Sequence, residues 1–244
     1  MEKLIYTAMS GAQHTLMAQQ IRANNLANVN TAGFRADYEQ VSAAALSGIG
    51  YPSRVLAREE PAGSNFASGP LMATGRKLDL AIRGDGFFAV QTADGKEAYT
   101  RAGNVEVDAE GRMLVNGRPL LGEGGELMLP EHRSLSFGND GTVSVTPPGG
   151  GARLEAGRIK LVQPETRDLV KGEDGLFRLR QGGDAESSDS VVLASGYLEG
   201  SNVNAVDELV NTMALTRNFE LQVRMMKSAD EQARLGAKLV SGQG

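Results

Sequence analysis

The chain has 244 residues, of which 41% are hydrophobic, and it carries a formal net charge of −5 at pH 7 with no cysteine. This length allows one large domain or two small ones with a sizeable core. The absence of Cys excludes disulfides and Cys-ligated metal sites, and the acidic balance gives no basic face for nucleic acid. No apolar run reaches the length of a membrane-spanning helix, and the N-terminus lacks a signal-peptide pattern. We therefore expect no membrane insertion, and export, if it occurs, without a cleavable signal.

Residues 1–35 should form a long helix that ends near residues 30–33, where Asn and Gly favour termination. Apolar or small residues recur there in alternating steps of four and three, the heptad spacing of a seam that packs along another helix. The seam is weak, because Ala and Gln fill several positions and Gly11 interrupts it. The helix should therefore need a partner. The seam consists of Ile5, Met9, Ala12, Leu16, Gln19, Ala23 and Leu26.

Three asparagines, Asn24, Asn25 and Asn28, lie near the predicted end of this helix. One interpretation is a polar C-terminal cap, since Asn is common at helix ends. The other is control of register, because an amide in a helix seam permits few alignments of the partner. The sequence leaves both interpretations open.

Residues 36–77 are rich in Gly and Pro without periodicity, and we expect an extended arm with little helix. Residues 78–200 instead show short apolar runs separated by Gly-containing turns. Asp94-Gly95 and Asn116-Gly117 each separate two such runs, as in two-residue hairpins. The sequence therefore predicts an all-β antiparallel domain over residues 78–200.

Residues 201–244 return to helix, with Asn204 as a candidate N-cap. Two apolar sets follow that do not share one register, so the helix either rotates its apolar face or touches two different neighbours. The overall prediction is an α+β fold, with terminal helices in a coiled-coil-like bundle, an extended arm and a mostly β centre. The first set is Val206, Leu209, Val210 and Met213, and the second is Phe219, Val223, Met226, Asp230, Ala233, Ala237 and Val240.

Three blocks resemble the flagellar basal-body rod and hook axial proteins. They are Ala23 to Phe34 (ANNLANVNTAGF), the central segments at residues 78–88 and 99–104, and the C-terminal segments at residues 201–210 and 217–220. The blocks occur in the family's order and span most of the chain, and the opening LIYTAMSGA is most similar to the proximal rod members. Asn218 stands where the family more often has Ala, which affects only local packing.

The resemblance implies a structural subunit of the proximal rod that polymerises through its terminal helices and transmits torque from motor to hook. The implied partners are copies of this chain, other rod proteins and the flagellar type III export apparatus, in a rod that crosses the periplasm. The ends should gain order on assembly, which circular dichroism of the full chain against residues 36–200 would test. The expected assembly residues are Leu16, Asn24, Asn25, Leu26, Asn28, Gly33, Phe34, Val206, Leu209, Val210, Met213, Phe219 and Val223.

Catalytic chemistry finds little support in the sequence, and we expect no enzyme activity, cofactor or metal. His14 and His132 are the only histidines and have no metal-binding spacing. Asp79 and Asp85 could be imagined as the carboxylate pair of a peptidoglycan-cleaving enzyme, although Gly-Asp-Gly is more simply a turn. That enzyme and a distal rod subunit are the two alternatives.

Overall fold

The computed structural model describes residues 2–45, 55–240 and 242, with side chains for all of these except residues 2–4, 40–45, 55–62, 239 and 240. The chain divides into two compact units. The helical unit comprises residues 1–28, 36–65 and 203–244, and the β unit comprises residues 29–35 and 66–202. The terminal helices pack together and the centre is an antiparallel β region, so the predicted α+β class is confirmed.

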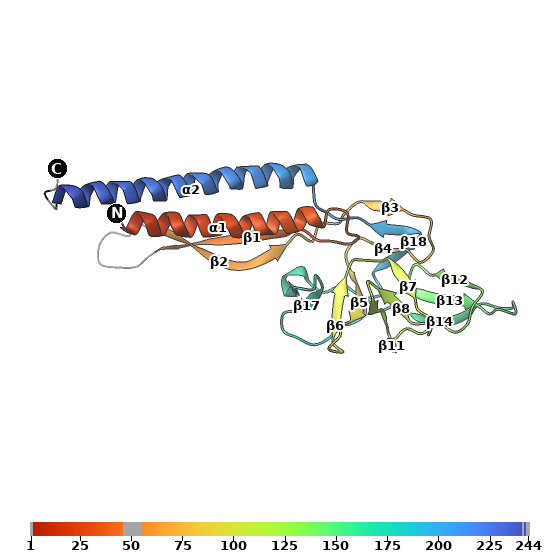
Figure 1. Cartoon of the computed structure of the whole chain (residues 1–244). Coiled ribbons are helices and arrows are strands. Elements are labelled where there is room, and N and C mark those ends of the chain that lie inside the picture. Colours follow the sequence, from red (N-terminus) through yellow and green to blue (C-terminus); the bar gives the residue numbers. More distant parts are fainter. Residues whose placement is uncertain (1, 46–54, 241, 243–244) are drawn as a thin grey trace. The chain divides into compact units, whose positions relative to one another are not determined.

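The helical unit contains α1 (Glu2–Ala27) and α2 (Ala205–Val240), which run antiparallel and side by side (Figure 1). Strands β1 (Asp37–Ala45) and β2 (Val55–Ser64) form an antiparallel ribbon beside α1. The Gly and Pro content of residues 36–77 predicted an extended arm and gave no sign of paired strands. The four-segment division of the chain, with boundaries after residues 35, 77 and 200, stays a prediction.

The helix ends follow from local hydrogen bonding. At the start of α2, the Asn204 Oδ1 accepts a hydrogen bond from the Val206 amide at 3.1 Å, as the N-cap prediction requires. α1 ends at Ala27, before the predicted range of residues 30–33. The Asn28 side chain bonds to the Asn24 carbonyl at 2.9 Å, which satisfies one of the carbonyls left free at a helix end.

The β unit holds seventeen further strands, all paired antiparallel, and one 3-10 helix. The largest sheet has the order β15-β5-β6-β17-β16, and two three-stranded sheets have the orders β7-β8-β9 and β12-β13-β14; the rest form two-stranded ribbons. The elements are β3 (Leu71–Ala73), β4 (Leu80–Arg83), β5 (Phe87–Gln91), β6 (Glu97–Thr100), β7 (Val105–Val107), β8 (Met113–Val115), β9 (Arg118–Pro119), β10 (Leu121–Gly122), β11 (Gly125–Glu126), β12 (Ser134–Phe137), β13 (Thr142–Thr146), β14 (Leu154–Arg158), β15 (Leu161–Val162), η1 (Thr166–Asp168), β16 (Leu169–Lys171), β17 (Phe177–Leu179), β18 (Val192–Ser195) and β19 (Tyr197–Glu199).

Strand β5 separates two hydrophobic clusters of the β unit. Phe88 and Val90 face the larger cluster, and Phe87 and Ala89 face the smaller one, which is the period-two alternation of a strand buried on both sides. Aromatic packing closes the smaller cluster, where the Phe87 and Phe177 rings lie 5.5 Å apart. The β unit therefore has a complete core of its own.

Of the two predicted two-residue hairpins, Asn116-Gly117 is confirmed, whereas Asp94-Gly95 lies in a longer turn in which Gln91 pairs with Glu97. Asn116 and Gly117 have φ values of 51° and 76° and join β8 to β9, with Val115 paired to Arg118. Both turn residues thus adopt the positive φ that a two-residue type I′ hairpin requires. Gly95, with φ of 76°, lies in the turn between β5 and β6.

Candidate assembly surfaces

On the α1 side, small side chains form the contact with α2. Ala8, Ala12 and Ala229 are all buried, and a Cβ added to Gly11 would lie 2.9 Å from the Gln222 Nε2. The inward positions of α2 follow a single alternation of four and three residues, so the helix does not rotate its inner face. These positions are Glu208, Thr212, Leu215, Phe219, Gln222, Met226, Ala229, Ala233 and Gly236.

A buried amide lies where α1, α2 and β1 meet. Asn25 is fully buried; its Oδ1 accepts a hydrogen bond from the Asp37 amide at 2.9 Å, and its Nδ2 donates to the Asp37 carbonyl at 2.8 Å. The same Nδ2 also donates to Glu208 Oε1 at 3.1 Å, and Arg22 pairs with that carboxylate at 3.2 Å. Asn25 therefore joins α1, β1 and α2, as the register interpretation requires, whereas Asn28 acts as the cap.

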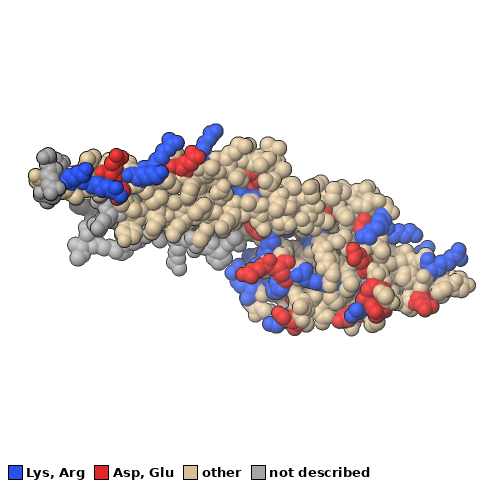
Figure 2. All heavy atoms as spheres, in the orientation of Figure 1, with Lys and Arg blue, Asp and Glu red and all other residues tan. Residues whose placement is uncertain are grey.

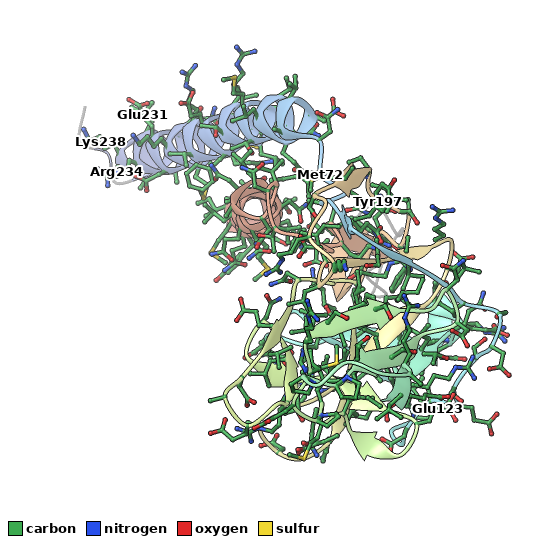
Figure 3. The ribbon with its side chains drawn as sticks, turned by 90° about the vertical axis from the view of Figure 1, so that its right-hand side faces the viewer. Met72, Glu123, Tyr197, Glu231, Arg234 and Lys238 are labelled. Carbon is green, nitrogen blue, oxygen red and sulfur yellow. The ribbon has the colours of Figure 1, made fainter. Side chains whose placement is uncertain are left out.

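Large apolar side chains point away from the contact. On α1, Tyr6, Met9, Leu16 and Met17 are 42 to 66% exposed, and on the first turns of α2, Val206, Leu209, Val210 and Met213 are 45 to 66% exposed. The α1 surface is poor in charge, because residues 4–21 contain no Asp, Glu, Lys or Arg, whereas the exposed Asp207 lies next to the α2 surface. In Figure 2 the charged groups of α2 gather toward its C-terminal end, where Figure 3 labels Glu231, Arg234 and Lys238. We call these two sets the outer apolar surfaces of α1 and α2.

The predicted assembly residues fall into three groups. Outward lie Leu16, Asn24, Val206, Leu209, Val210 and Met213, together with Met9 and Ala23 of the predicted seam. Inside the helical unit, Asn25 is buried, while Leu26, Asn28, Phe219 and Val223 are half-buried. Gly33 and Phe34 belong to the β unit. Their roles in assembly stay predictions.

Gly33 occupies a position that only glycine fits. Its φ is +69°, and an added Cβ would overlap the backbone of Arg101 and Ala102. Its amide donates to the Glu199 carbonyl at 2.8 Å. Next to it, the Lys171 Nζ lies 4.1 Å from the centre of the Phe34 ring, a cation–π contact.

A buried ionic cluster in the β unit was missed by the sequence analysis. Glu199 is 1% exposed and pairs with Arg35 at 2.6 Å and with Arg101 at 2.6 Å. Burial lowers the pKa of Arg101, as does the neighbouring Arg35 cation, while Glu199 raises it. The paired residues lie far apart in the sequence, so no local pattern could have indicated them.

The candidate catalytic groups are used structurally. Asp79 is held by the Arg76 guanidinium at 2.6 Å. Burial would raise the pKa of Asp79, but hydrogen bonds from Arg76 and Thr74 outweigh it and place that pKa below its ordinary value. Asp85 is exposed. A general acid for glycoside cleavage needs a raised pKa, so Asp79 is poorly suited to that role.

The two histidines belong to different units of the chain. His14 belongs to the helical unit, with its Nδ1 3.8 Å from the Glu39 carboxylate, and His132 belongs to the β unit, with its Nδ1 2.9 Å from the Pro130 carbonyl. Among the residues that the structure describes, no group of three His, Asp or Glu side chains is placed to hold a metal ion. No helix within the same residues is both long and apolar enough to span a membrane.

The segments that match known protein families correspond to the terminal helices and the β region of the structure. Residues 5–35 match the family described as flagella basal body rod protein, and residues 81–145 match the flagellar hook protein FlgE/F/G D1 domain. Residues 194–239 match the flagellar basal body rod FlgEFG protein C-terminal family. The three matches correspond to the three blocks quoted from the sequence.

Full-length relatives agree with these matches. The chain is 39% identical to the flagellar basal-body rod protein FlgF of Escherichia coli and to that of Salmonella typhimurium, in each case over 99% of both chains. It is 31% identical to the flagellar basal-body rod protein FlgG of Bacillus subtilis, over 95% of this chain and 96% of the relative. The resemblance seen in the sequence is confirmed, and the chain belongs to the family of flagellar basal-body rod proteins.

Proposed function

We propose that the chain is a non-enzymatic structural subunit of the proximal rod and joins neighbouring subunits through the outer apolar surfaces of α1 and α2. The observation that carries this proposal is the inversion of side-chain size in the helical unit. Alanines such as Ala8 and Ala12 are buried, while Tyr6, Val206 and Met213 are about two-thirds exposed. Large apolar side chains that are exposed together on one helix face, as at Val206 and Met213, are typical of an interface.

The energetics support contact with several neighbours. Burying a half-exposed Val, Leu or Met would contribute about 1 kcal/mol, so each outer surface offers only a few kcal/mol before the entropy of association is subtracted. One such contact is weak, and a rod subunit would need several at once. The two surfaces also differ in sequence, so the α1 surface of one subunit can meet the α2 surface of the next head to tail. Such heterologous contacts build an open helical assembly when the rotation between subunits does not close a ring.

The proximal position, the partners and the mechanical role extend this proposal. The 39% identity to FlgF proteins, against 31% to an FlgG protein, supports the proximal rod over the distal alternative. The partners would be copies of this chain, other rod proteins and the type III export apparatus. The rod would cross the periplasm in the basal body and carry torque from the motor toward the hook.

The test replaces one outward side chain by a charge. Met213→Asp places a carboxylate on the outer apolar surface of α2, and burying it in an interface is costly. In the source bacterium we expect at least about tenfold less of this subunit in purified basal bodies, with loss of swimming. Immunoblots of the basal bodies and swimming assays measure both effects.

Leu235→Asp is the matched control, because Leu235 is 57% exposed on the same helix but neighbours Arg234. This variant should assemble normally, and circular dichroism should show that both variants keep the helix content of the parent chain. Normal incorporation of Met213→Asp would overturn the proposed surface. Labelling the subunit in isolated basal bodies for electron microscopy would separate a proximal from a distal position.

A further inference from the structure

The connections between the two units meet at Glu199. The chain passes between the units after residues 28, 35, 65 and 202. Within the β unit, Glu199 binds the segments beside the first three of these crossings. Its carbonyl accepts from the Gly33 amide at 2.8 Å, and its Oε1 accepts from Arg35 Nη1 at 2.6 Å and from the Gly69 amide at 2.9 Å.

The fourth crossing is joined to the same group of segments. The Asn202 amide donates to the Phe34 carbonyl at 3.3 Å, and the Asn202 Nδ2 donates to the Ala67 carbonyl at 2.8 Å. Lys171 adds a further hydrogen bond to the Arg35 carbonyl at 2.8 Å. All four chain ends that leave the β unit are therefore bonded to one another or to Glu199.

The second carboxylate oxygen of Glu199 binds to Arg101, which follows strand β6. Its Oε2 accepts from Arg101 Nε at 2.7 Å. The remaining donors of Arg101 bond to the Gly86 carbonyl at 2.7 Å and the Gly84 carbonyl at 2.8 Å. One buried carboxylate thus links the four crossing segments to the loop between β4 and β5.

From this geometry we propose that Glu199 is a positioning residue that holds the connections of the β unit in one fixed arrangement. A carboxylate is required, because its two oxygens accept from donors on opposite sides. A Gln side chain has one oxygen, so its NH₂ group would face Arg101 on one side or Arg35 and the Gly69 amide on the other. Two buried guanidinium groups would also lose their only countercharge within the cluster, which is strongly unfavourable.

Amide hydrogen exchange on the full-length chain tests the proposal directly, because three amides report on the cluster. In Glu199→Gln, the amides of Gly33, Gly69 and Asn202 should exchange at least about tenfold faster than in the parent chain, while those of β5 change less than about threefold. A general loss of stability would instead accelerate exchange at the three amides and at the amides of β5 together. Equal changes in β5 and in the three amides would overturn the proposal, as would no change at all.

Glu97→Gln provides the matched control. Glu97 is also a buried carboxylate of the β unit, and it pairs with Lys160 at 2.7 Å, away from the crossing segments. Its substitution should leave the three reporter amides within about threefold of the parent. Acceleration of those amides as large as in Glu199→Gln would show that they report general destabilisation.

A second pair of variants keeps the test valid if Glu199→Gln does not fold. Arg35→Met leaves the Glu199–Arg101 pair intact, and Arg35→Lys keeps a cation that can reach Oε1. The buried Arg35 Nε has no hydrogen-bond partner, so lysine loses nothing at that atom. We expect the Gly33 and Asn202 amides to exchange faster in Arg35→Met and to return toward the parent rate in Arg35→Lys; equal rates in the two variants would overturn the proposal.

The consequence for motility rests on the proposed function. If the rod carries torque through this subunit, cells with Glu199→Gln should assemble rods but swim more slowly under viscous load. The exchange experiment uses the free chain and does not depend on assembly. An exchange pattern like that of the parent chain in Glu199→Gln would therefore overturn only the proposed role of Glu199. Normal incorporation of Met213→Asp would overturn only the proposed role of the outer apolar surface of α2.

Discussion

The fully buried apolar side chains of the two units differ in size. In the β unit, Leu80, Phe88 and Leu120 are almost completely buried, whereas in the helical unit the buried apolar side chains are alanines and Met213 faces outward. The same physical effect therefore builds a core within the β unit, and we propose that in the helical unit it acts through contacts with neighbouring subunits. The β unit should behave as a stable domain, and the helical unit as a surface for assembly.

The largest expected effect is on the free energy of unfolding, when a side chain is truncated in the core of the β unit and, for comparison, on the outer surface of α1. Phe88→Ala removes a ring from the core of the β unit and should lower its free energy of unfolding by about 3 to 5 kcal/mol. Leu16→Ala removes an outward side chain of α1 and should cost less than about 1 kcal/mol in the free chain. Urea unfolding measures both, with near-ultraviolet circular dichroism for the β unit and the 222 nm signal for the helices.

The contrast would fail if Leu16→Ala destabilised the free chain as much as Phe88→Ala does. That result would mean that Leu16 is buried within the single chain. The same Leu16→Ala variant should nevertheless reduce incorporation into basal bodies, since its proposed contact lies with a neighbour.

The helical unit shows why periodicity predicts elements better than contacts. The seam from Ile5 to Leu26 correctly indicated a helix, but Met9, Leu16 and Ala23 in it are exposed. In α2, the conspicuous set from Val206 to Met213 faces outward, while the inner face begins with Glu208 and Thr212. A hydrophobic pattern identifies residues that tend to be buried. It does not show whether they pack within the chain or against a neighbouring molecule.

In the β unit, sequence patterns predicted strands and a turn but not the buried ionic contacts. Its strands and its Asn-Gly turn were predictable, because alternation and positive-φ residues are local signals. The cluster of Arg35, Arg101 and Glu199 was not, since buried ionic residues look like surface residues in a sequence. The ribbon of β1 and β2 was missed for a related reason. Gly and Pro make up eight of the 32 residues 46–77, which include β2, and the pairing of the two strands is fixed only in three dimensions.

An intermediate effect is expected from the buried amide of the helical unit. Asn25→Ala removes the partner of the Asp37 amide and carbonyl, and leaving such buried groups unsatisfied costs about 1 to 3 kcal/mol. Asn24→Ala is the control, because Asn24 is exposed, and should change the free energy of unfolding by less than about 0.5 kcal/mol. Urea unfolding at 222 nm measures the difference, and similar values for both variants would contradict a register role for Asn25.

The smallest expected effect concerns the pH dependence of the β unit. The pKa of Asp79 is lowered in the folded chain from 3.8, so its ionic pairing stabilises the fold fully above that pH and is lost as the pH falls through the folded-state pKa. Arg76 is half-exposed, and the pair should therefore contribute no more than about 1 kcal/mol. Asp79→Asn should lower the urea midpoint at pH 7, and the gap to the parent chain should narrow at pH 3 and below. A gap that stays constant over this range would show that Asp79 acts through packing or neutral hydrogen bonds, since only the ionised carboxylate gives a pH-dependent term.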